Sequence, residues 1–501
     1  MSEKTVLIIG AGLAGLSTGC YARMNGFRTH ILEHQSAPGG VICSWTRSGF
    51  LFDGGIHFLM DHNSPRSLHQ VYRELGVFES NRLLDIERYI AVYDASSGRY
   101  VEITRDLERT AESLKAFSPS DSDIVSELFS AAAALRGLDM GAQMETPPEL
   151  MGFADSMRQM WGMLKMRRFF FGKFGTSVRD YVQRIGDPWL REVILSLFFP
   201  DVPVWLVLVL LADLADGQLG LLESGSQGFV KAIEDRYRNL GGEISYGSTV
   251  EKILVKDDRA VGVRTSDGRE ITADVVVSAA DGYSTIYRLL EGRYTNRAID
   301  DRYSKWALFK PYVLVSLGVN RRFESEPHFL MMKLSSPVEL AGGKAEWIGF
   351  RIFNHSDKFA PGGKTALQAY IETEWDWWDE LQKKDRKAYD AEKERIARDV
   401  ISRLEVRFPG ISSQVEVTDV ATPYTLWRYT LTHRASFEGF LPTPKTIMAR
   451  IPKTLPGLDN FYMAGQWVQP GGGVPVCIYS GRHVVRILCR KLGRDFVTSV
   501  P

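Results

Sequence analysis

The N-terminal segment has the hydrophobic pattern of a strand, a helix and a second strand in succession. Residues 5–9 (TVLII) form a short, continuous apolar run, which is typical of a strand buried on both faces of a parallel sheet. The glycine-rich segment 10–15 (GAGLAG) follows at once and opens a helix-like segment that extends to about Asn25. Residues 29–32 form the second strand-like run, which ends at Glu33. The pattern therefore predicts a βαβ unit, the building block of α/β folds.

Two later stretches continue this pattern. In 240–281, short apolar runs alternate with turns that contain Asp and Gly, as in strands joined by tight turns. Near the C-terminus, a strand-like run at 460–465 precedes a helix-like segment at 474–492. If all of these belong to one nucleotide-binding domain, the residues between them form a second domain that is inserted twice. We predict that the first domain consists of 1–90, 222–300 and 441–501, and the second, substrate domain of 91–221 and 301–440.

The composition narrows the class of protein. With 44% hydrophobic residues among 501, the chain can bury sizeable cores and is not a disordered protein. Its 61 basic and 61 acidic side chains balance, which argues against a partner nucleic acid. The cysteines form neither a CxxC pair nor a cluster with zinc-ligand spacing, so we expect no disulfide framework, no metal site and a reducing, cytoplasmic location. They are Cys20, Cys43, Cys477 and Cys489.

The glycine-rich segment after the first strand has the spacing GxGxxG, and its context favours a dinucleotide site. Gly10 permits a tight turn, Gly12 lets the backbone approach a pyrophosphate, and Gly15 allows close packing of the helix. The N-terminus of that helix supplies partial positive charge for the phosphates. Glu33 follows 18 positions after Gly15 and is suited to accept hydrogen bonds from the adenosine ribose, which disfavours NADP.

Three further glycine-rich segments favour FAD over NAD. Residues 38–40 (PGG) and 52–57 (FDGGIH) follow the second strand, where a longer cofactor would continue beyond its pyrophosphate. Residues 470–473 (PGGG) lead into the C-terminal helix, whose N-terminal dipole can stabilise the negative charge that a reduced flavin carries around N1 and O2. Each segment alone is also compatible with an ordinary turn or connector. Their combination with GxGxxG predicts a flavin site.

Together these segments resemble the phytoene-desaturase and carotenoid-isomerase family of flavoproteins, within the wider amine-oxidase-like group. The resemblance rests on GAGLAGL with Glu33, on PGG and FDGGIHF, on ADVVVSAAD at 273–281 and on PGLDNFYMAGQWVQPGGGVPVCIYSGR at 456–482. It covers most of the chain, although the middle domain is matched less specifically. It implies an α/β fold in which a Rossmann-like FAD-binding domain of the GR2 type is joined to a discontinuous α+β substrate domain.

The resemblance also assigns residues to FAD. These are Gly10, Gly12, Leu13, Ala14, Gly15, Glu33, Gly40, Val41, Gly54, Gly55, Ile56, Val250, Ala279, Gly465, Gln466, Gly473 and Val474. Two positions depart from the family pattern. Many members carry an acidic residue where Gln466 stands, which weakens the expected contact with the ribityl chain. Carotene desaturases often have glycine where Trp467 stands, so a bulky side chain there is expected to change the size or type of substrate.

His57 is the candidate for a catalytic side chain, because the resemblance places it near the flavin, where it could relay a proton. The alternative is a histidine that hydrogen-bonds to backbone at the end of a sheet. Members of the family often act without an obvious base, since a hydride step depends on placement of the flavin. The catalytic assignment therefore stays open.

Two segments bear on the membrane and on the substrate. Segment 151–175 interleaves basic residues with Met, Trp and Phe at helical spacing, which is typical either of a helix at a lipid surface or of a Met-rich wall of the substrate domain. The apolar run 202–212 is too short to cross a bilayer and is predicted to form core or tunnel lining. Both suit an apolar substrate and allow peripheral membrane contact.

These observations predict a two-domain FAD enzyme that dehydrogenates a hydrophobic, unsaturated molecule of the isoprenoid polyene class. Because no second GxGxxG lies between a strand and a helix to hold a nicotinamide, we expect oxygen, a quinone or a diffusing carrier to reoxidise the flavin. Redox-neutral polyene isomerisation, saturation, and oxidation of a secondary-metabolite intermediate are alternatives. A carrier of prenylated partners without redox chemistry is a further alternative, although such a protein has no need for a full FAD site.

Overall fold

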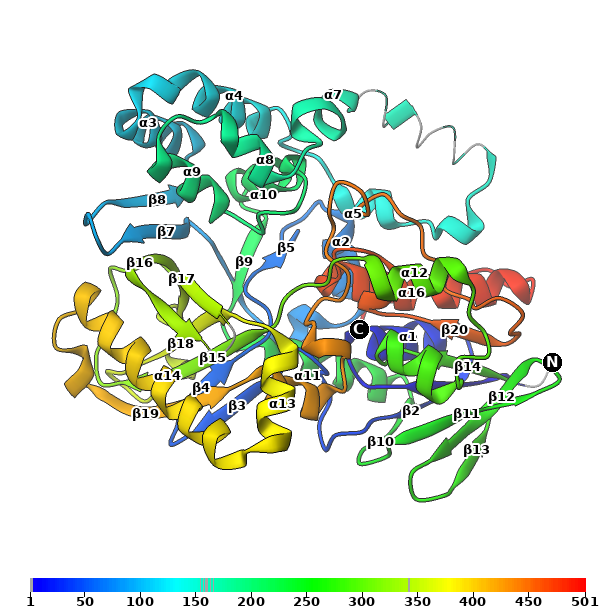
Figure 1. Cartoon of the computed structure of the whole chain (residues 1–501). Helices are drawn as coiled ribbons and strands as arrows, with labels where there is room; N and C mark the ends of the chain where they lie inside the picture. The colour runs from blue at the N-terminus through cyan, green and yellow to red at the C-terminus, as the bar shows by residue number, and fades with distance from the viewer. Residues whose placement is uncertain are drawn as a thin grey trace.

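The computed structural model describes residues 3–501 except 154, 156, 158–160, 163, 165, 341 and 342. Strands from the N-terminal, middle and C-terminal parts of the chain build a parallel sheet with the order β10-β2-β1-β14-β20 (Figure 1). The strands are β1 (Thr5–Ile9), β2 (Arg28–Leu32), β10 (Glu243–Ser245), β14 (Val275–Ser278) and β20 (Phe461–Met463). The predicted strands at 5–9, 29–32 and 460–465 are therefore confirmed to within a residue or two.

Alternate residues of the central strand face two different layers. Val6 and Ile8 pack on one side against the helices α1 (Leu13–Met24), α11 (Gly225–Asn239) and α16 (Gly473–Lys491). Leu7 and Ile9 pack on the other side against an antiparallel sheet. That sheet consists of β11 (Val250–Lys256), β12 (Arg259–Thr265) and β13 (Glu270–Thr272). The period of two in a strand thus produces a three-layer α/β unit from a continuous apolar run.

A second, seven-stranded sheet has the order β19-β15-β18-β17-β16-β7-β8. Its strands are antiparallel except for β16 and β7, which pair in parallel. They are β7 (Arg88–Asp94), β8 (Tyr100–Thr104), β15 (Tyr312–Val319), β16 (Phe329–Leu340), β17 (Gly343–Ile352), β18 (Thr365–Glu372) and β19 (Val415–Ala421). Leu330 and Met332 of β16 point into a core against Ile396 and Val400 of α14. Phe329 and Met331 alternate with them and face a cavity.

The remaining helices cover the two sheets or form a cap above them (Figure 1). The cap comprises α3 (Leu107–Phe117), α4 (Ser122–Ala133), α8 (Val178–Tyr181), α9 (Pro188–Leu195) and α10 (Val204–Ala215). Others are α2 (Ser67–Glu74), α5 (Met140–Met144), α7 (Arg167–Phe170), α12 (Arg297–Lys305), α13 (Trp375–Lys384), α14 (Arg386–Arg407) and α15 (Pro423–Thr430). Short strands complete the fold: β3 (Ser44–Arg47) pairs with β4 (Phe50–Asp53), and β9 (Leu219–Leu222) lies between β5 (Leu59–Met60) and β6 (Leu83–Asp85).

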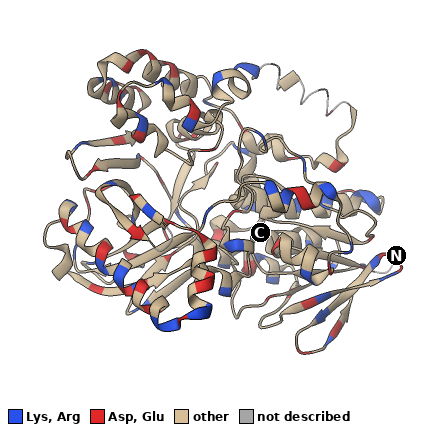
Figure 2. Cartoon of the chain, viewed as in Figure 1, with Lys and Arg blue, Asp and Glu red and all other residues tan. Residues whose placement is uncertain are grey.

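Charged residues of both signs mingle along α13 and α14 (Figure 2). Pairs four residues apart, such as Lys383 with Asp379 at 2.7 Å, hold opposite charges together on the solvent-exposed side of these helices. The other side of α14 buries Ile396, Val400 and Leu404. This charged stretch is therefore amphipathic.

The structure describes the apolar run 202–212 completely but segment 151–175 only in part. The apolar run 202–212 forms most of α10, which is buried along nearly its whole length and contributes to the cavity wall. Of segment 151–175, residues 154, 156, 158–160, 163 and 165 lie outside the described residues. Among the helices of the described residues, none combines the length and the apolarity that crossing a bilayer requires.

Candidate active site

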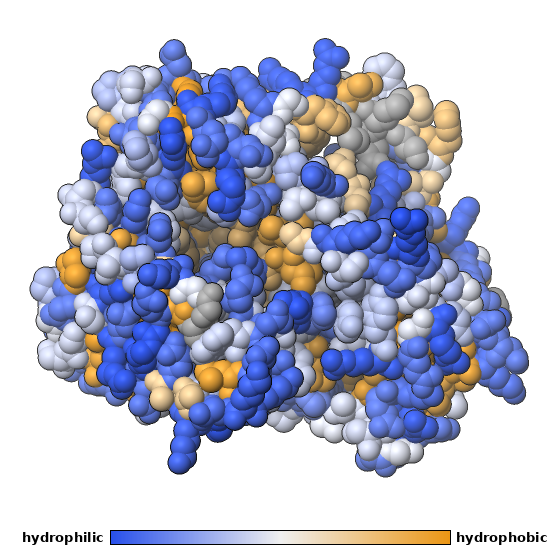
Figure 3. All heavy atoms as spheres, in the orientation of Figure 1, coloured by the Kyte–Doolittle hydropathy of each residue, from blue (hydrophilic) through white to orange (hydrophobic). Residues whose placement is uncertain are grey.

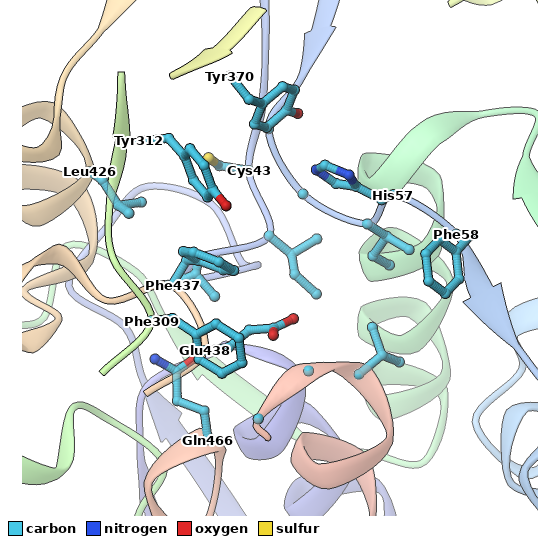
Figure 4. A pocket seen from close by; sticks show the side chains of 18 of the residues that line it. Cys43, His57, Phe58, Phe309, Tyr312, Tyr370, Leu426, Phe437, Glu438 and Gln466 are labelled. Atoms are coloured by element: carbon cyan, nitrogen blue, oxygen red, sulfur yellow. The ribbon is translucent and has the colours of Figure 1, made fainter. Parts of the chain in front are cut away.

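A large cavity extends from the carboxyl ends of the parallel strands to the seven-stranded sheet and the cap. Its volume is about 2030 Å³, beyond the range of roughly 300–1,000 Å³ that is usual for small-molecule sites. Figure 3 shows a hollow with hydrophobic atoms near the centre of the molecule, and Figure 4 shows side chains that line the cavity. The space is sufficient for a dinucleotide and a second large molecule.

The glycine turn after β1 leads into α1, and the space next to Gly12 in this turn is open. The Gly10 amide donates to the Leu32 carbonyl at 2.8 Å, which holds the turn against β2. A methyl group added at Gly15 would lie 1.9 Å from the Gly10 carbonyl oxygen, so only glycine allows the helix to start this close to the turn. At Gly12 an added methyl would meet no atom nearer than 3.9 Å. The turn thus leaves a cradle over the N-terminus of α1.

Glu33 lies at the end of β2 and is almost completely buried. One carboxylate oxygen accepts a hydrogen bond from the Ala11 amide at 2.6 Å, and the other accepts from the Gln35 amide at 2.8 Å. The Ser248 amide donates to the Glu33 carbonyl at 2.8 Å, which brings the start of β11 and Val250 to this end of the sheet. Glu33 therefore links the glycine turn to β2, a role that the sequence did not reveal.

The middle and C-terminal motifs meet the glycine turn from the other side. The Ala279 amide donates to the Ile9 carbonyl at 2.9 Å, and the Ala279 carbonyl oxygen lies 3.4 Å from the position of a Cβ on Gly10. Gly465 lies against Ala14, because a Cβ added to Gly465 would be 3.5 Å from the Cβ of Ala14. The φ of Gly465 is +106°. Residues separated by more than 450 positions in the sequence thus surround one end of the cavity.

The FDGGIH segment lines the cavity and is held by buried polar groups. Asp53, which is 1% exposed, accepts hydrogen bonds from the amides of Gly55 at 3.1 Å and of Ser226 at 2.9 Å. The Ile56 amide donates to the Ser226 hydroxyl at 2.7 Å. A methyl group on Gly55 would lie 2.6 Å from that hydroxyl oxygen. Glycine at this position therefore permits the close contact with α11.

Arg351 of β17 completes this arrangement. Its guanidinium donates to the Asp53 carbonyl at 2.8 Å and to the Ile56 carbonyl at 3.0 Å, and it lies 3.9 Å from the Asp53 carboxylate. The side chain is 6% exposed, so these carbonyls have little access to water. Arg351 was not among the residues predicted from the sequence. Its signal is a charged residue inside the apolar run 348–353 (IGFRIF), since a buried charge requires a partner.

The C-terminal motif forms a sharp turn at the start of α16. Gly471, Gly472 and Gly473 all have positive φ, at 100°, 42° and 71°, which side chains other than glycine rarely adopt. Gly473 and Val474 line the cavity. The Gln466 amide group donates to the Ser436 carbonyl at 3.1 Å, so its NH₂ is already engaged by the 432–436 loop.

His57 points into the cavity (Figure 4). Its ring makes an edge-on contact with Tyr370, with centroids 4.8 Å apart, and a tilted contact with Phe329 at 5.7 Å. Within the described residues the ring has no hydrogen-bond partner. Burial, with Arg351 nearby, holds the pKa of His57 well below its ordinary value. The imidazole is therefore neutral, and the alternative of a ring bound to backbone is not what the structure shows.

Trp467 does not line the cavity, which corrects the expectation that it alters the space for substrate. Its indole is 3% exposed and packs edge-on against Phe440, with centroids 5.1 Å apart, and against Tyr303. Trp467 lies in a short 3-10 helix, Gln466–Val468, in which Gln466 lines the cavity whereas the indole of Trp467 faces this aromatic cluster. Trp467 therefore has no part in the cavity wall.

The cysteines are all free, and Cys43 and Cys477 line the cavity. Burial raises the pKa of each of these two thiols to about 12, so both are neutral. Among the described residues, no group of three or more His, Cys, Asp or Glu side chains comes together in a way that could hold a metal ion.

A family model described as flavin containing amine oxidoreductase matches residues 13–489. The chain belongs to this family. Membership confirms the resemblance given by the motifs, the α/β fold class and the assignment of the protein as an FAD-dependent oxidoreductase. The match begins at Leu13, directly after Gly10 and Gly12, and includes α1, the seven-stranded sheet and nearly all of α16.

Individual members of the family are distant from this chain. It is 24% identical over 512 residues to the chloroplastic prolycopene isomerase of Daucus carota, covering 98% of this chain and 81% of the relative. It is also 24% identical over 517 residues to a lycopene-forming phytoene desaturase of Pseudescherichia vulneris, covering 98% and 100%. The chain is thus related over its length to carotenoid desaturases and an isomerase alike.

Solved structures show the same fold. An oxidoreductase from Methanosarcina mazei aligns over 96% of this chain and 100% of its own with a TM-score of 0.61 and 16% identity. Cyclohexylamine oxidase from Brevibacterium oxydans IH-35A aligns over 98% and 100%, again with a TM-score of 0.61, at 13% identity.

The residues of this member of the family fit FAD. The open space in front of Gly12 at the N-terminus of α1 suits a pyrophosphate, and the buried Glu33 retains lone pairs for ribose hydroxyls. The positive-φ glycines at the start of α16 expose backbone to a flat ring. When bound, FAD supplies a hydride acceptor; the chain supplies the cradle, the apolar wall and the exclusion of water.

Proposed function

We propose that this protein dehydrogenates a long, apolar, unsaturated substrate of the isoprenoid polyene class, with the flavin as hydride acceptor. The observation that supports the proposal is the apolar chamber that continues from the cofactor cradle to the seven-stranded sheet and the cap. Its walls carry aromatic and aliphatic side chains from β15, β16, β17 and α10 and from the loops between elements. These are Phe58, Phe199, Trp205, Val209, Leu210, Phe309, Leu314, Phe329, Met331, Trp347 and Phe437.

The physical argument concerns the length and the polarity of the chamber. An apolar chain gains about 25 cal/mol for each Å² that leaves water, so a polyene of many carbons can bind tightly with few polar contacts. Small polar amines have no such need. The names of the curated relatives, phytoene desaturase and prolycopene isomerase, agree with a long unsaturated hydrocarbon as substrate.

As part of this proposal, the cofactor contacts are those that the sequence predicts, from Gly10 to Val474. Gly12 and the start of α1 hold the pyrophosphate, Glu33 and the Val250 backbone face the adenosine, and the start of α16 faces the ring. The proposed division into two interleaved domains is supported by the sheets, because the strands of the parallel sheet come from 1–90, 222–300 and 441–501. One strand, β7, begins at Arg88, slightly before the predicted boundary.

Redox-neutral isomerisation is the second candidate. It is favoured by the equal identity to prolycopene isomerase and to phytoene desaturase. The two candidates require different states of the cofactor, since dehydrogenation consumes oxidised flavin whereas isomerisation leaves its oxidation state unchanged.

The test is to incubate the FAD-loaded protein with phytoene and with a cis-lycopene in liposomes, followed by absorption spectra and product masses. Dehydrogenation shifts the absorption to longer wavelength with a loss of two hydrogens per step. A shift at unchanged mass would replace the proposal with isomerisation, and a gain of mass with a shift to shorter wavelength would replace it with saturation. No change with any polyene, despite reducible bound flavin, would refute this substrate class.

We further propose peripheral contact with a membrane through the segment that leads into and out of α7. Trp161, Leu164 and Phe171 are 60%, 49% and 57% exposed, and Arg167, Arg168 and Lys173 lie in the same segment. Exposed aromatic and basic side chains together suit an anionic lipid surface. Sedimentation with phosphatidylglycerol vesicles should fall in Phe171→Ser but not in Val406→Ser, which removes an equally exposed side chain on α14. Equal binding of both variants would refute this contact.

A further inference from the structure

Glu438 lies on a loop whose backbone is fixed on both sides. The Phe309 amide donates to the Gly439 carbonyl at 3.0 Å, and the Gly471 amide donates to the Phe440 carbonyl at 3.0 Å. The Ser436 hydroxyl donates to the Gly439 carbonyl at 2.9 Å. The loop is thus tied to the strand region that leads into β15 and to the glycine turn before α16. The position of Glu438 relative to the start of α16 is therefore well defined.

Two glycines make room for this glutamate. A methyl group on Gly472 would lie 2.2 Å from the Glu438 carbonyl oxygen, and one on Gly473 would lie 3.4 Å from its Oε1. Figure 4 shows the carboxyl group projecting from the loop into the cavity, beside the rings of Phe437 and Phe309. The carboxyl group therefore lies at the N-terminal end of α16, where the chain is expected to face the flavin.

The carboxyl group has no counterion in the part of the chain that the structure describes. Within the described residues it forms neither a hydrogen bond nor an ion pair. The titratable groups that face it are Tyr312 of β15 and Cys477 of α16, and the pKa of each is raised, so both are protonated and neutral. Its other neighbours, Phe309 and Phe437, are apolar. Burial alone raises the pKa of Glu438 to about 8.

We propose that Glu438 is the proton-carrying group of this site: its carboxylate accepts the proton that the substrate loses while the flavin takes the hydride. The proposal rests on the proposed dehydrogenation. Its geometric basis is an unpaired carboxyl group that a fixed loop holds inside the chamber at the start of α16. The sequence contains no motif that singles out this residue, although an isolated acid within SFEGFL (436–441) is its signal.

The step balances in atoms and charge. One substrate C–H bond breaks and its hydrogen leaves with the electron pair as hydride to the flavin. The neighbouring C–H bond breaks, its electrons form the new C=C bond, and its proton binds to the Glu438 carboxylate. The site begins with a neutral oxidised flavin and an anionic glutamate and ends with an anionic reduced flavin and a neutral glutamic acid. Its net charge does not change, which matters in a chamber with little water.

The test is the midpoint potential of the bound flavin against pH, with dithionite as reductant and no substrate, in the wild type, Glu438→Gln and Glu394→Gln. If the glutamate takes up a proton when the flavin is reduced, each pH unit above about 8 lowers the equilibrium constant for reduction of the wild-type flavin by one additional factor of ten. For a two-electron couple this is an additional slope of about 30 mV per pH unit. Glu438→Gln should lack it, because the amide cannot titrate. Glu394, 74% exposed on α14, should leave the slope unchanged.

Glu438→Asp is the second variant and should retain the additional slope, because it keeps a carboxyl group on the same loop. Curves for the wild type and Glu438→Gln that run parallel throughout would overturn the proposal. A protein that does not bind FAD would instead overturn the proposed function, so the two failures are distinguishable. A polyene that is dehydrogenated at equal rate by Glu438→Gln and the wild type above pH 8 would also overturn the role of Glu438.

Discussion

Replacing Arg351 with lysine tests whether its guanidinium holds the FDGGIH segment. The guanidinium donates to two carbonyls three residues apart, at 2.8 Å to Asp53 and 3.0 Å to Ile56, and lies 3.9 Å from the Asp53 carboxylate. A single ammonium cannot reproduce this fork, so at least one buried carbonyl loses its partner. An unpaired buried acceptor costs about 1–3 kcal/mol. We expect Arg351→Lys to lose about 2–3 kcal/mol of unfolding free energy.

Arg351→Met also leaves Asp53 without a neighbouring cation and should lose about 3–5 kcal/mol. Urea unfolding monitored by circular dichroism measures both losses, and titration with FAD measures the effect on the cradle. Because the FDGGIH segment lines the cavity, FAD affinity should fall as well. The fall should be about tenfold for each 1.4 kcal/mol by which the substitution destabilises the FAD-bound protein relative to the free protein. Arg322→Lys is the control, since its pair with Glu324 at 3.3 Å is exposed. A loss in Arg351→Lys no larger than in this control would refute the reasoning.

Further predictions concern the glycine turn and the titrating groups of the cavity. Gly12→Ala should fold normally but fail to bind FAD, because its methyl group enters the open space expected to hold the pyrophosphate. Gly15→Ala should not fold, because its methyl group would lie 1.9 Å from a carbonyl oxygen. Thermal unfolding and FAD titration distinguish the two variants, and normal FAD affinity in Gly12→Ala would contradict the proposed pyrophosphate site. Cys477 should react slowly with iodoacetamide at neutral pH, as its thiol pKa is about 12, and rapid alkylation of the folded protein would contradict this. The raised pKa of Glu438 means that the folded state binds this proton more tightly than the unfolded state does. The wild type should therefore lose stability relative to Glu438→Gln as pH rises from about 4.5 to about 8, with no further change at higher pH. A difference between their unfolding free energies that does not vary with pH would contradict the raised pKa. Dehydrogenation should accelerate as pH rises through about 8, because the carboxylate is then the reactive form.

Local patterns predicted the strand, the glycine turns and the helix starts around the expected cofactor site well. The apolar run 5–9, the GxGxxG turn and the glycines before α16 each depend on short-range requirements, namely burial on both faces, close packing of a helix and positive φ. Such requirements leave signals within a few residues. The same holds for α10, whose length alone excludes a membrane span.

The chamber depends on contacts between distant residues, which a single sequence does not reveal. Arg351 and Asp53 are separated by 298 positions, and neither has a motif that points to the other. The parallel pairing of β16 with β7 likewise joins residues 330–333 to residues 91–94, far apart in the sequence. The orientation of Trp467 was also hidden, because its contact with Phe440 is a tertiary contact that no motif in the sequence indicates.

The central claim, hydride transfer from a polyene to the flavin of this enzyme, is tested most directly by an anaerobic single turnover. The FAD-loaded protein is mixed with phytoene in liposomes, and the visible absorbance of the flavin and the mass of the polyene are followed together. The account predicts that the flavin loses its oxidised spectrum in proportion to the polyene that has lost two hydrogens. A flavin that stays oxidised while the polyene changes, or a polyene that stays unchanged beside a flavin that dithionite reduces readily, would contradict it.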